Sequence, residues 1–433
     1  MKLTSPGRSL AAVAVLGLAA AALTACAAPT DAQEPSAEPI QFWGWAPGYA
    51  EAVDLWNSTH EQKVVFETTP SGSKGGYAKV QAAAKAGNGP CLAQVGNESI
   101  ASFVLEGMLE DVSDEAAAYE DQYPEAAWSV MKVADGVYGI PVDSAPLGLF
   151  YRADVYERLG LAPATTWEEF AEQSKQVRAS DLSVYLSSFS PADMGWWGGL
   201  TQQARSTWFD IEGDSWKVTV DSPATQQVAG YWQRLLDADA VLNTEIESPE
   251  WWEKAQSGAI ASHIAPVWWA GVLEGAAANS SGQWRVAPLP NLDADDPSNG
   301  TQGGSATAVV SGCDNVQGAL EFANWMSTDE DALQILIDQA AVFPASVPGS
   351  SHPALDSEVE YFGGQQIFRV FVDANKAVDS TWAWGPMTTQ TGESFDTAMQ
   401  PAINGEGTLS DGLADAQANI VKVLDAKGLS VSE

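Results

Sequence analysis

Short apolar runs alternate with longer amphipathic stretches through most of this chain. The apolar runs are rich in Val, Ile, Leu and Phe and are bounded by Gly, Pro, Ser or Asn, so they are predicted to be buried strands. They cover residues 40–45, 63–67, 91–95, 147–151, 183–189, 259–264 and 306–311. Strands that alternate with helices favour mostly parallel sheets covered by helices. The pattern therefore predicts an α/β fold.

The stretches between these runs carry the signals of helix starts. Thr166 and Glu169 have the spacing of a capping box, and the apolar positions within 170–177 continue one helical face. A second amphipathic pattern covers residues 316–326, and the acidic segment 328–331 is predicted to cap a third helix. Helices are therefore expected in the gaps between the strands.

The first residues of the chain have the pattern of an export signal. The segment of residues 1–8 is short and basic. The segment of residues 10–23 is apolar but too short to span a bilayer comfortably. They end in Leu-Thr-Ala-Cys, and this ending resembles the lipobox of bacterial lipoproteins. The resemblance implies that a signal peptide of residues 1–25 is removed and that Cys26 is lipidated as the new N-terminus. The alternative is an ordinary signal peptide followed by a chance cysteine.

The segment that begins at Cys26 offers little that a core could bury. Residues 26–37 are mainly Ala, Pro, Ser, Asp, Glu and Gln, so they are predicted to form a disordered tether. About four hundred residues follow, which is enough for two domains with their own cores. No second apolar run reaches the length of a membrane span.

The chain is strongly acidic, with 57 Asp and Glu against 20 Lys and Arg and a formal net charge of −37. Removal of the signal peptide would also remove Lys2 and Arg8 and leave the mature chain more acidic. Such a charge repels nucleic acid phosphates and argues against a broad electrostatic contact with anionic lipid. We interpret the acidity as a property that keeps a secreted protein soluble.

Several common catalytic and cofactor-binding motifs are absent from the sequence. It contains no Gly-Lys pair of a Walker-type phosphate loop, no HExxH motif and no GxSxG motif. Its three histidines, His60, His263 and His352, lack partners at metal-ligand spacing. No cofactor, metal site or catalytic residue is therefore predicted. Carboxylate pairs of the kind a glycoside hydrolase needs can be drawn almost anywhere among 57 acidic residues, so they carry little information.

Tryptophan is unusually frequent, with 18 residues against 10 Tyr and 13 Phe. A flat indole with a polar edge suits the C–H face of a pyranose ring, and nearby Asp, Glu, Asn and Gln suit its hydroxyls, so a sugar ligand is favoured. The alternative is that one indole of each close pair packs into the core, with Trp251 and Trp252 as the first candidates. The close pairs, several of them beside Gly or Pro, are Trp43 and Trp45, Trp196 and Trp197, Trp251 and Trp252, Trp268 and Trp269, and Trp382 and Trp384.

Six segments of the chain, in the same order, resemble those of the maltose-binding-protein-like family 1 solute-binding proteins, the sugar-binding components of ABC importers. The most similar is YGIPVDSAPLGLFYRADVYERLGLAPATTWEEF, which begins at Tyr138. The others are QFWGWAPGYAEAVDLWN from Gln41, GYAKVQAAAKAGNGPCLAQVGNESI from Gly76, QSGAIASHIAPVWWAGVL from Gln256, GGSATAVVSGCDNVQGALEFANWM from Gly303 and MQPAINGEGTLSDGLADAQANI from Met399. The resemblance covers essentially everything after the tether.

The resemblance implies a two-lobed, periplasmic-binding-protein-like fold. Each lobe would be a mostly parallel sheet covered by helices, and a hinge would close the two lobes on the ligand. The first lobe would hold residues 38–148 and 300–345, and the second residues 149–299 and 346–433. Binding between lobes agrees with the general preference of ligands for domain interfaces.

The resemblance also implies a set of ligand-binding residues. They are Trp45, Asn97, Glu98, Asp143, Trp268 or Trp269, Gly304, and Trp382 or Trp384, together with Ser71 and Trp196 or Trp197 from loops of variable length. Two positions depart from the family pattern. Cys91 replaces an aspartate, and Val267 stands where a tryptophan often follows Pro or Ser, so the stacking role is shared between Trp268 and Trp269.

Two cysteines remain if Cys26 is lipidated, and disulfides persist in exported proteins. By the resemblance, Cys91 opens a strand of the first lobe and Cys313 closes the returning, antiparallel strand of that lobe. Both would then lie at one end of one sheet, where they could form a disulfide. The alternative is a pair of small buried residues with free thiols.

The sequence therefore predicts a lipid-anchored extracellular protein that captures an oligosaccharide and delivers it to the permease subunits of an ABC transporter. We expect a monomer on the outer face of the cytoplasmic membrane, and the Ala-, Gly- and Trp-rich composition suggests a Gram-positive source. The alternatives are a secreted glycoside hydrolase or other carbohydrate-processing protein, and a binder of a non-sugar solute such as a peptide or polyamine. The identity, linkage and length of the sugar stay open.

Overall fold

The computed structural model describes residues 38–190, 192–293, 295–379 and 381–432. The predicted signal peptide, the lipidated Cys26 and the tether of residues 26–37 lie outside the described residues. Within the described part of the chain, no helix combines the length and the apolar character needed to cross a lipid bilayer.

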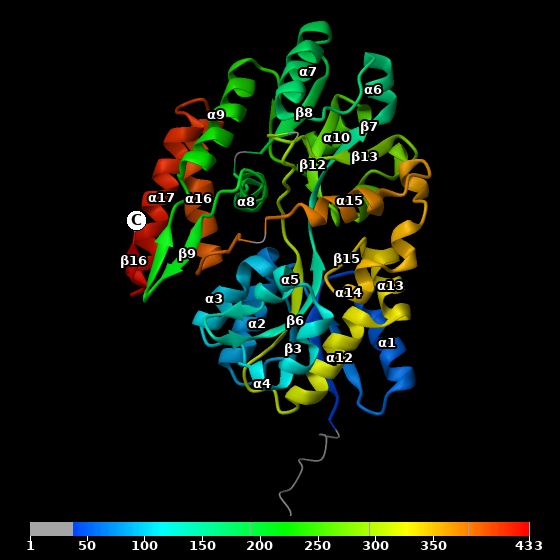
Figure 1. The fold of residues 1–433 in the computed structure, drawn as a ribbon, viewed down its shortest axis with the longest axis vertical. Coiled ribbons are helices and arrows are strands. Elements are labelled where there is room, and N and C mark those ends of the chain that lie inside the picture. Colours follow the sequence, from blue (N-terminus) through cyan, green and yellow to red (C-terminus); the bar gives the residue numbers. More distant parts are fainter. Residues whose placement is uncertain (1–37, 191, 294, 380, 433) are drawn as a thin grey trace, which may run out of the picture. The chain divides into compact units, whose positions relative to one another are not determined.

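The first sheet lies in the lower part of Figure 1 and has six strands, most of which run in one direction. Their order is β15 (Phe343–Pro344), β6 (Gly139–Ser144), β14 (Ser305–Val309), β3 (Leu92–Gly96), β1 (Ile40–Gly44) and β2 (Val64–Thr68). β1 is parallel to β2 and β3, while β14 returns antiparallel between β3 and β6. β3 and β6 therefore run in the same direction, and their carboxyl ends lie at the same edge of the sheet.

Helices flank this sheet, and aromatic side chains fill the space between them. The ring centroid of Phe42 in β1 lies 5.2 Å from that of Tyr49, 5.2 Å from that of Phe66 and 5.7 Å from that of Phe322. The helices are α1 (Tyr49–Thr59), α2 (Gly76–Lys85), α3 (Ile100–Leu105), α4 (Ser113–Ala116), α5 (Glu125–Ser129), α12 (Val316–Thr328) and α13 (Glu330–Ala340). A short hairpin of β4 (Lys132–Val133) and β5 (Gly136–Val137) precedes β6.

The second sheet has five strands in the order β11 (Leu242–Asn243), β8 (Tyr185–Phe189), β12 (Ile260–Pro266), β7 (Leu147–Arg152) and β13 (Trp284–Pro288). β11, β8 and β12 pair in parallel, and β7 is antiparallel to both of its neighbours. Every residue of β12 is buried. A strand that is covered on both faces buries all of its side chains, so this strand is mostly apolar. Its buried Ser262 hydroxyl donates to the carbonyl of Leu186 at 2.7 Å.

More helices surround the second sheet, and its core is divided between two hydrophobic clusters. The helices are α6 (Ala153–Leu159), α7 (Trp167–Ser180), α8 (Met194–Gln203), α9 (Pro223–Asp237), α10 (Pro249–Ser257), α11 (Trp269–Ala276), α15 (Ile367–Lys376), α16 (Thr388–Ile403) and α17 (Leu409–Ala426). The short helix α14 (Val347–Ser350) packs instead against α12 and β15 of the first sheet. A small sheet of β9 (Phe209–Glu212), β10 (Ser215–Val218) and β16 (Val431–Ser432) accompanies α17.

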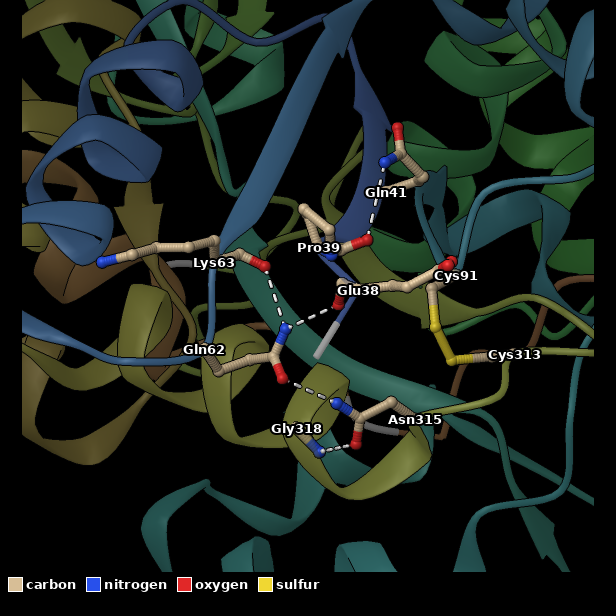
Figure 2. The surroundings of a disulfide bond; sticks show 9 residues. All are labelled: Glu38, Pro39, Gln41, Gln62, Lys63, Cys91, Cys313, Asn315 and Gly318. Carbon is tan, nitrogen blue, oxygen red and sulfur yellow. Dashed lines mark hydrogen bonds between the residues drawn. A yellow bond between two sulfur atoms is a disulfide. The ribbon is translucent and has the colours of Figure 1, made fainter. Parts of the chain in front are cut away.

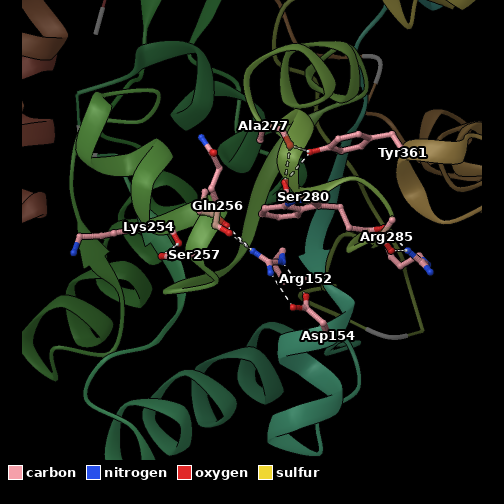
Figure 3. Close-up of polar contacts among 12 residues, drawn as sticks. Arg152, Asp154, Lys254, Gln256, Ser257, Ala277, Ser280, Arg285 and Tyr361 are labelled. Carbon is pink, nitrogen blue, oxygen red and sulfur yellow. Dashed lines mark hydrogen bonds and ion pairs between the residues drawn. The ribbon is translucent and has the colours of Figure 1, made fainter.

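One buried arginine connects the second sheet to its helices (Figure 3). Arg152 ends β7 and is only 4% exposed. Its Nη1 donates to the carbonyl oxygens of Ala255 at 2.9 Å and Gln256 at 3.0 Å, in the last turn of α10. Its Nε and Nη2 donate to the two carboxylate oxygens of Asp154 at 2.8 Å each. The bidentate ion pair and the helix-end carbonyls together satisfy a charge that would be costly to bury alone.

All seven predicted strands are present, with ends within two residues of the predicted bounds. The predicted capping box is also present, because Thr166 Oγ1 accepts from the backbone N–H of Glu169 at 3.2 Å and the Glu169 carboxylate accepts from the N–H of Thr166 at 3.3 Å. The pattern did not predict β6, β13 or the shorter strands β4, β5, β9, β10, β11, β15 and β16. Pro141 interrupts β6 and Arg285 interrupts β13, and a proline or a charge inside a short run masks a strand.

We call the six-stranded sheet with its helices the first lobe, and the five-stranded sheet with its helices the second lobe. The chain passes between the two lobes through residues 145–146, through residues 289–293 and 295–304, and through residues 351–352, which we call the hinge segments. The Leu147 N–H donates to the carbonyl of Gly300 at 3.0 Å, and the Gln302 N–H donates to the carbonyl of Ala145 at 3.0 Å, so two of these segments are bonded together. Helix α13 packs in part with the second-lobe core, and the predicted boundary at residue 345 stays a prediction.

A disulfide joins Cys91 to Cys313, whose Cα atoms are 4.5 Å apart (Figure 2). Cys91 precedes β3 and Cys313 follows β14, which are antiparallel neighbours, so the two cysteines meet at one end of the first sheet. Close by, the Gln62 side chain donates to the carbonyl of Glu38 at 3.0 Å and accepts from Asn315 Nδ2 at 3.0 Å. These contacts attach the chain just before β1 to the start of α12.

Candidate ligand-binding cleft

A cavity of about 360 Å³ lies between the two lobes, with both lobes and the hinge segments in its walls. Asn97 follows β3 and Asp143 lies near the end of β6, so the first lobe contributes groups from the carboxyl ends of its strands. The second lobe contributes Asp379 and Trp384 from the segment between α15 and α16. Carboxyl ends of strands at a domain interface are a common position for a small-molecule site.

Asp143 is the acidic group that the first lobe presents to this cavity. Its Oδ1 accepts from the backbone N–H of Ser305 at 2.9 Å and from the hydroxyl of the same residue at 2.6 Å. Burial raises the pKa of Asp143 to about 6, and the nearby charge of Glu98 acts in the same direction, while the two bonds from Ser305 lower it. The carboxylate is therefore ionised at neutral pH but titrates within reach of mildly acidic conditions.

Asn97 lies on the cavity wall and carries a buried side-chain oxygen, Oδ1, for which the described residues supply no hydrogen-bond donor. Its position depends on Gly304, whose φ of 86° is in the left-handed region and where a Cβ would lie 2.5 Å from Asn97 Nδ2. A buried acceptor without a donor is costly, so a ligand hydroxyl could satisfy it.

Glu98 was predicted to contact the ligand, but it is not among the residues that line this cavity. Its carboxylate accepts from the Tyr77 hydroxyl at 2.9 Å and from the Ser99 hydroxyl at 3.2 Å. Burial raises the pKa of Glu98 above its usual value. Trp45 packs edge-on against Tyr77, with ring centroids 5.9 Å apart, and is also absent from the lining.

Trp382 and Trp384 are half-buried and line the second-lobe side of the cavity. Their rings are nearly perpendicular, at 85° and with centroids 5.4 Å apart. A Cβ at Gly198 of α8 would lie 2.6 Å from the Trp384 ring, so the glycine leaves the space in which this ring lies. The Trp382 Nε1 is buried and has no acceptor among the described residues. Each ring could offer a face or an edge to a sugar.

Three of the predicted tryptophans are instead inside the second-lobe core. Trp196 is 1% exposed, Trp197 is 0% exposed and Trp269 is 2% exposed. The indole N–H of Trp196 donates to the carbonyl of Ile264 at 3.1 Å. Protein side chains cover these rings in the structure, so they are not brought to the cavity wall. The sequence left open core packing for one member of each pair, which is what the pair of Trp268 and Trp269 shows, whereas both Trp196 and Trp197 are buried.

Trp268 and Ser71 are not among the residues that line the cavity. Trp268 is half-buried, and its Nε1 donates to the carbonyl of Gln302 at 3.0 Å, in a hinge segment. A Cβ at the cavity-lining Gly303 would lie 3.1 Å from this same nitrogen. Ser71 is the residue before the short 3-10 helix Gly72–Lys74, and its side chain makes no capping hydrogen bond there. The structure therefore groups Asn97, Asp143, Trp382 and Trp384 around the cavity.

Several polar residues of the cavity wall were missed by the sequence analysis. Asn375 lies in the last turn of α15, and its Oδ1 accepts from the Ser144 hydroxyl of the first lobe at 2.7 Å. Gln202 of α8 donates to the carbonyl of Asp379 at 2.7 Å and accepts from the N–H of Thr301 at 2.8 Å. The position of Asp379, three residues before Trp382, was a signal that the sequence analysis could have used. Asn375 and Gln202 lie on helices, where no sequence pattern distinguishes them from other polar residues.

No group of three or more His, Cys, Asp or Glu side chains that could hold a metal ion is found among the residues that the structure describes. His263 is buried beside Trp251 and Trp269, with ring centroids 5.1 and 4.9 Å away. Burial lowers the pKa of His263 to about 3, so this ring is neutral at physiological pH.

Comparison with known proteins identifies the family. Residues 44–333 match the bacterial extracellular solute-binding protein family. The chain belongs to this family. It is 24% identical to a lactose-binding protein of Rhizobium radiobacter over 77% of this chain and 81% of that protein. It is 23% identical to an arabinooligosaccharide-binding protein of Halalkalibacterium halodurans over 78% of this chain and 79% of that protein.

Solved structures of ABC transporter binding proteins share the fold. The galacto-N-biose/lacto-N-biose I-binding protein of Bifidobacterium longum, solved with lacto-N-biose, has a TM-score of 0.82 and 26% identity over 92% of this chain and 100% of that chain. A binding protein of B. animalis subsp. lactis, solved with β-1,6-galactobiose, has a TM-score of 0.80 and 24% identity over 91% and 99%. The predicted two-domain, periplasmic-binding-type α/β fold is confirmed.

Proposed function

We propose that this protein binds a short oligosaccharide in the cavity between its lobes and delivers it to the permease subunits of an ABC importer. The observation that carries the proposal is the lining of the cavity, where Trp382 and Trp384 lie with the ionised Asp143 and the unsatisfied Oδ1 of Asn97. Indole rings suit the C–H faces of a sugar, while a carboxylate and an amide oxygen suit its hydroxyls. The names of the relatives, which bind lactose or arabinooligosaccharides, support the same ligand class.

The size of the cavity supports a ligand of about two sugar rings. Its volume of about 360 Å³ is at the lower end of the 300 to 1,000 Å³ that ligand pockets commonly have. The bound ligands of two structural neighbours, lacto-N-biose and β-1,6-galactobiose, are disaccharides. We propose Asn97, Asp143, Trp382 and Trp384 as the contact residues, with Gly304 holding Asn97 in place. Trp45, Ser71, Glu98 and Trp268 are proposed to shape the surroundings of the cleft.

A panel of sugars tests the ligand class. Lactose, lacto-N-biose, β-1,6-galactobiose and an arabinooligosaccharide would each be added at millimolar concentration, and the melting temperature compared with that in glycerol at the same concentration. A ligand that binds only the folded state raises the melting temperature. We expect a rise with at least one sugar. A rise with a polyamine or peptide, and with none of the sugars, would contradict the proposal.

We propose no catalytic step for this site. The alternative, a glycoside hydrolase, needs two carboxyl groups on opposite sides of the scissile bond. Prolonged incubation of the protein with the same four sugars, followed by chromatography, separates the two functions. We expect unchanged sugars, and the appearance of shorter products would favour the hydrolase instead.

We further propose that the protein is a monomer attached to the outer face of the cytoplasmic membrane through a lipidated Cys26. The support is the Leu-Thr-Ala-Cys sequence after an apolar segment that is too short to span the membrane. In a host that processes lipoproteins, Cys26→Ala should release the protein into the medium or leave its signal peptide uncleaved, because the acyl chains would be its main attachment. A variant that stays on the membrane after signal removal would show that the anchor is something else.

A further inference from the structure

The first turn of α16 is capped by a residue of the other lobe. Thr388 is the first residue of this second-lobe helix, and it follows Met387, whose φ of 58° is in the left-handed region. No side chain of its own segment caps the helix. Instead, the backbone N–H of Thr388 donates to Ser102 Oγ of the first-lobe helix α3 at 2.7 Å. The first N–H groups of a helix have no partner within the helix, so this bond satisfies one of them from across the cleft.

The hydroxyl groups of the same two residues complete a small network. Thr388 Oγ1 and Ser102 Oγ are 3.0 Å apart. Thr388 Oγ1 also donates to the carbonyl oxygen of Glu98, which can only accept. Because the Thr388 hydroxyl has one hydrogen, Ser102 must be the donor between the two hydroxyls. Ser102 Oγ then accepts a hydrogen bond from the Thr388 N–H and donates one to Thr388 Oγ1, and both bonds connect the two lobes.

This network lies beside the cavity, next to the residues that line it. Ile100 and Ala101 of α3 line the cavity directly before Ser102, and Trp384 lines it four residues before Thr388. Hinge residues such as Ala145 line the cavity as well. The cavity is therefore bordered by the hinge segments and by the two segments that Ser102 and Thr388 connect.

We infer that Ser102 and Thr388 form a clasp that holds the lobes together over the ligand and positions the Trp382–Trp384 segment against the first lobe. The inference rests on the proposed function, because it assigns these residues a part in retaining the ligand. When the lobes separate, the Thr388 N–H, the Ser102 hydroxyl and the Glu98 carbonyl all lose their partners to water. The clasp therefore stabilises the closed state, and its loss should increase the dissociation rate of the ligand more than it changes the association rate.

Variants of the two residues test the clasp in the full mature chain. Ser102→Ala removes both crossing bonds of the serine, and Thr388→Val removes the hydroxyl but keeps the β-branched shape. With lacto-N-biose as the probe, each should raise the dissociation rate about tenfold and change the association rate less than twofold, since each loses two hydrogen bonds of about 1 kcal/mol or less net. Thr388→Ser, which keeps the hydroxyl, should restore the dissociation rate. Thr389→Val, at the exposed neighbouring position, is the matched control.

The double variant separates a clasp from two independent effects. Ser102→Ala and Thr388→Val remove a shared bond, so the double variant should dissociate much more slowly than the product of the two single effects predicts. Dissociation rates within twofold of the wild type in both single variants, or effects that multiply fully, would overturn the clasp. A lower melting temperature alone, with unchanged dissociation, would also overturn it, since that would indicate a structural role only.

Amide exchange tests the clasp without any sugar. The Thr388 amide should exchange at least tenfold more slowly in the wild type than in Ser102→Ala, because its hydrogen bond is lost in the variant. Equal exchange in the two proteins would overturn the clasp. If lacto-N-biose fails to bind the wild type, the ligand proposal fails for this sugar, and the exchange experiment still decides whether the clasp exists.

Discussion

Asp143 and Ser305 are joined by two hydrogen bonds that both reach the same carboxylate oxygen, Oδ1, at 2.9 Å from the backbone N–H and 2.6 Å from the hydroxyl. The two residues lie on the antiparallel neighbours β6 and β14, directly opposite each other. Among the described residues, Ser305 thus holds one oxygen of a cavity-lining carboxylate and leaves Oδ2 for a ligand. A sugar hydroxyl that donates to this oxygen would bind the ionised form in preference to the protonated one.

Sugar binding should therefore weaken on mild acidification. The pKa of Asp143 is raised to about 6, and a hydrogen bond to an ionised group exceeds one to a neutral group by about 1 kcal/mol. We expect the dissociation constant to rise about fivefold from pH 7.5 to pH 5. Asp143→Asn should bind more weakly at both pH values and lose this dependence. Titration calorimetry would measure it, with the exposed Asp373→Asn as the control.

The weaker binding expected at pH 5 cannot come from a loss of folding stability through Asp143, because the effect of this group on stability has the opposite sign. The folded pKa of Asp143 lies above its unfolded value, so the folded state binds the proton more tightly. Acidification through pH 6 towards pH 4 then raises the free energy of unfolding through this group. Weaker binding at pH 5 with an unchanged or higher melting temperature would support a direct contact, and a pH dependence that survives in Asp143→Asn would contradict it.

The second prediction concerns stacking. Trp384→Ala should raise the dissociation constant about thirtyfold, since truncation of a buried indole anchor costs about 2 kcal/mol. Gly198→Ala should weaken binding without removing the ring, because its Cβ would lie 2.6 Å from Trp384 and displace it. Trp216→Ala, at a half-buried tryptophan outside the cavity lining, is the control. Equal affinities of all three variants and the wild type would remove Trp384 from the site.

The third prediction concerns an unfavourable carboxylate pair. Burial raises the pKa of Asp396 to about 6, the charge of Asp193 adds to the effect, and the Oδ1 of Asp396 is buried without a donor among the described residues. The folded state therefore disfavours ionised Asp396, and this cost is present above pH 6 and disappears towards pH 4. Asp396→Asn should raise the free energy of unfolding at pH 7 by about 1 kcal/mol, less than the full pKa shift because the side chain is partly exposed.

Urea unfolding at pH 7 and pH 5 measures this effect. The gain in Asp396→Asn should shrink at pH 5, where the wild-type carboxyl is already largely protonated. Asp415→Asn, at an exposed position where the carboxylate is in contact with solvent, should change the free energy of unfolding little at either pH. A variant that is less stable than the wild type at pH 7 would show that the charge of Asp396 has a favourable partner.

The fourth prediction concerns the Cys91–Cys313 disulfide. Thiol titration of the mature protein in denaturant should find no thiols from these two residues without reductant and two after reduction. Chain-entropy models assign a bridge across about 200 residues roughly 5 kcal/mol, and measured values are commonly smaller. Cys91→Ala with Cys313→Ala should therefore lower the melting temperature while sugar affinity in the folded variant stays the same. Two thiols in the unreduced protein would contradict the bridge.

Much of the candidate site depends on distances that the sequence does not contain. Asn97 and Glu98 are adjacent, yet the first lines the cavity and the second is bonded to Tyr77 and Ser99. Neighbouring residues at the end of a strand point in different directions, and only the helices packed there decide which direction leads to the cavity. Asn375 and Asp379 reach the same cavity from a part of the chain more than two hundred residues away. No local pattern marks such residues.

The sequence by itself determined seven of the strands, because buried strands are mostly apolar, and it determined the caps of α7 and α13 through short-range hydrogen bonds. It also identified tryptophan pairs as candidates for a sugar site. Only the tertiary structure decided which rings reach the cavity: Trp196 and Trp197 are enclosed by the second-lobe core, while Trp384 lies in space that Gly198 leaves open. An indole is equally suited to a core and to a sugar, so its role depends on what distant segments pack against it.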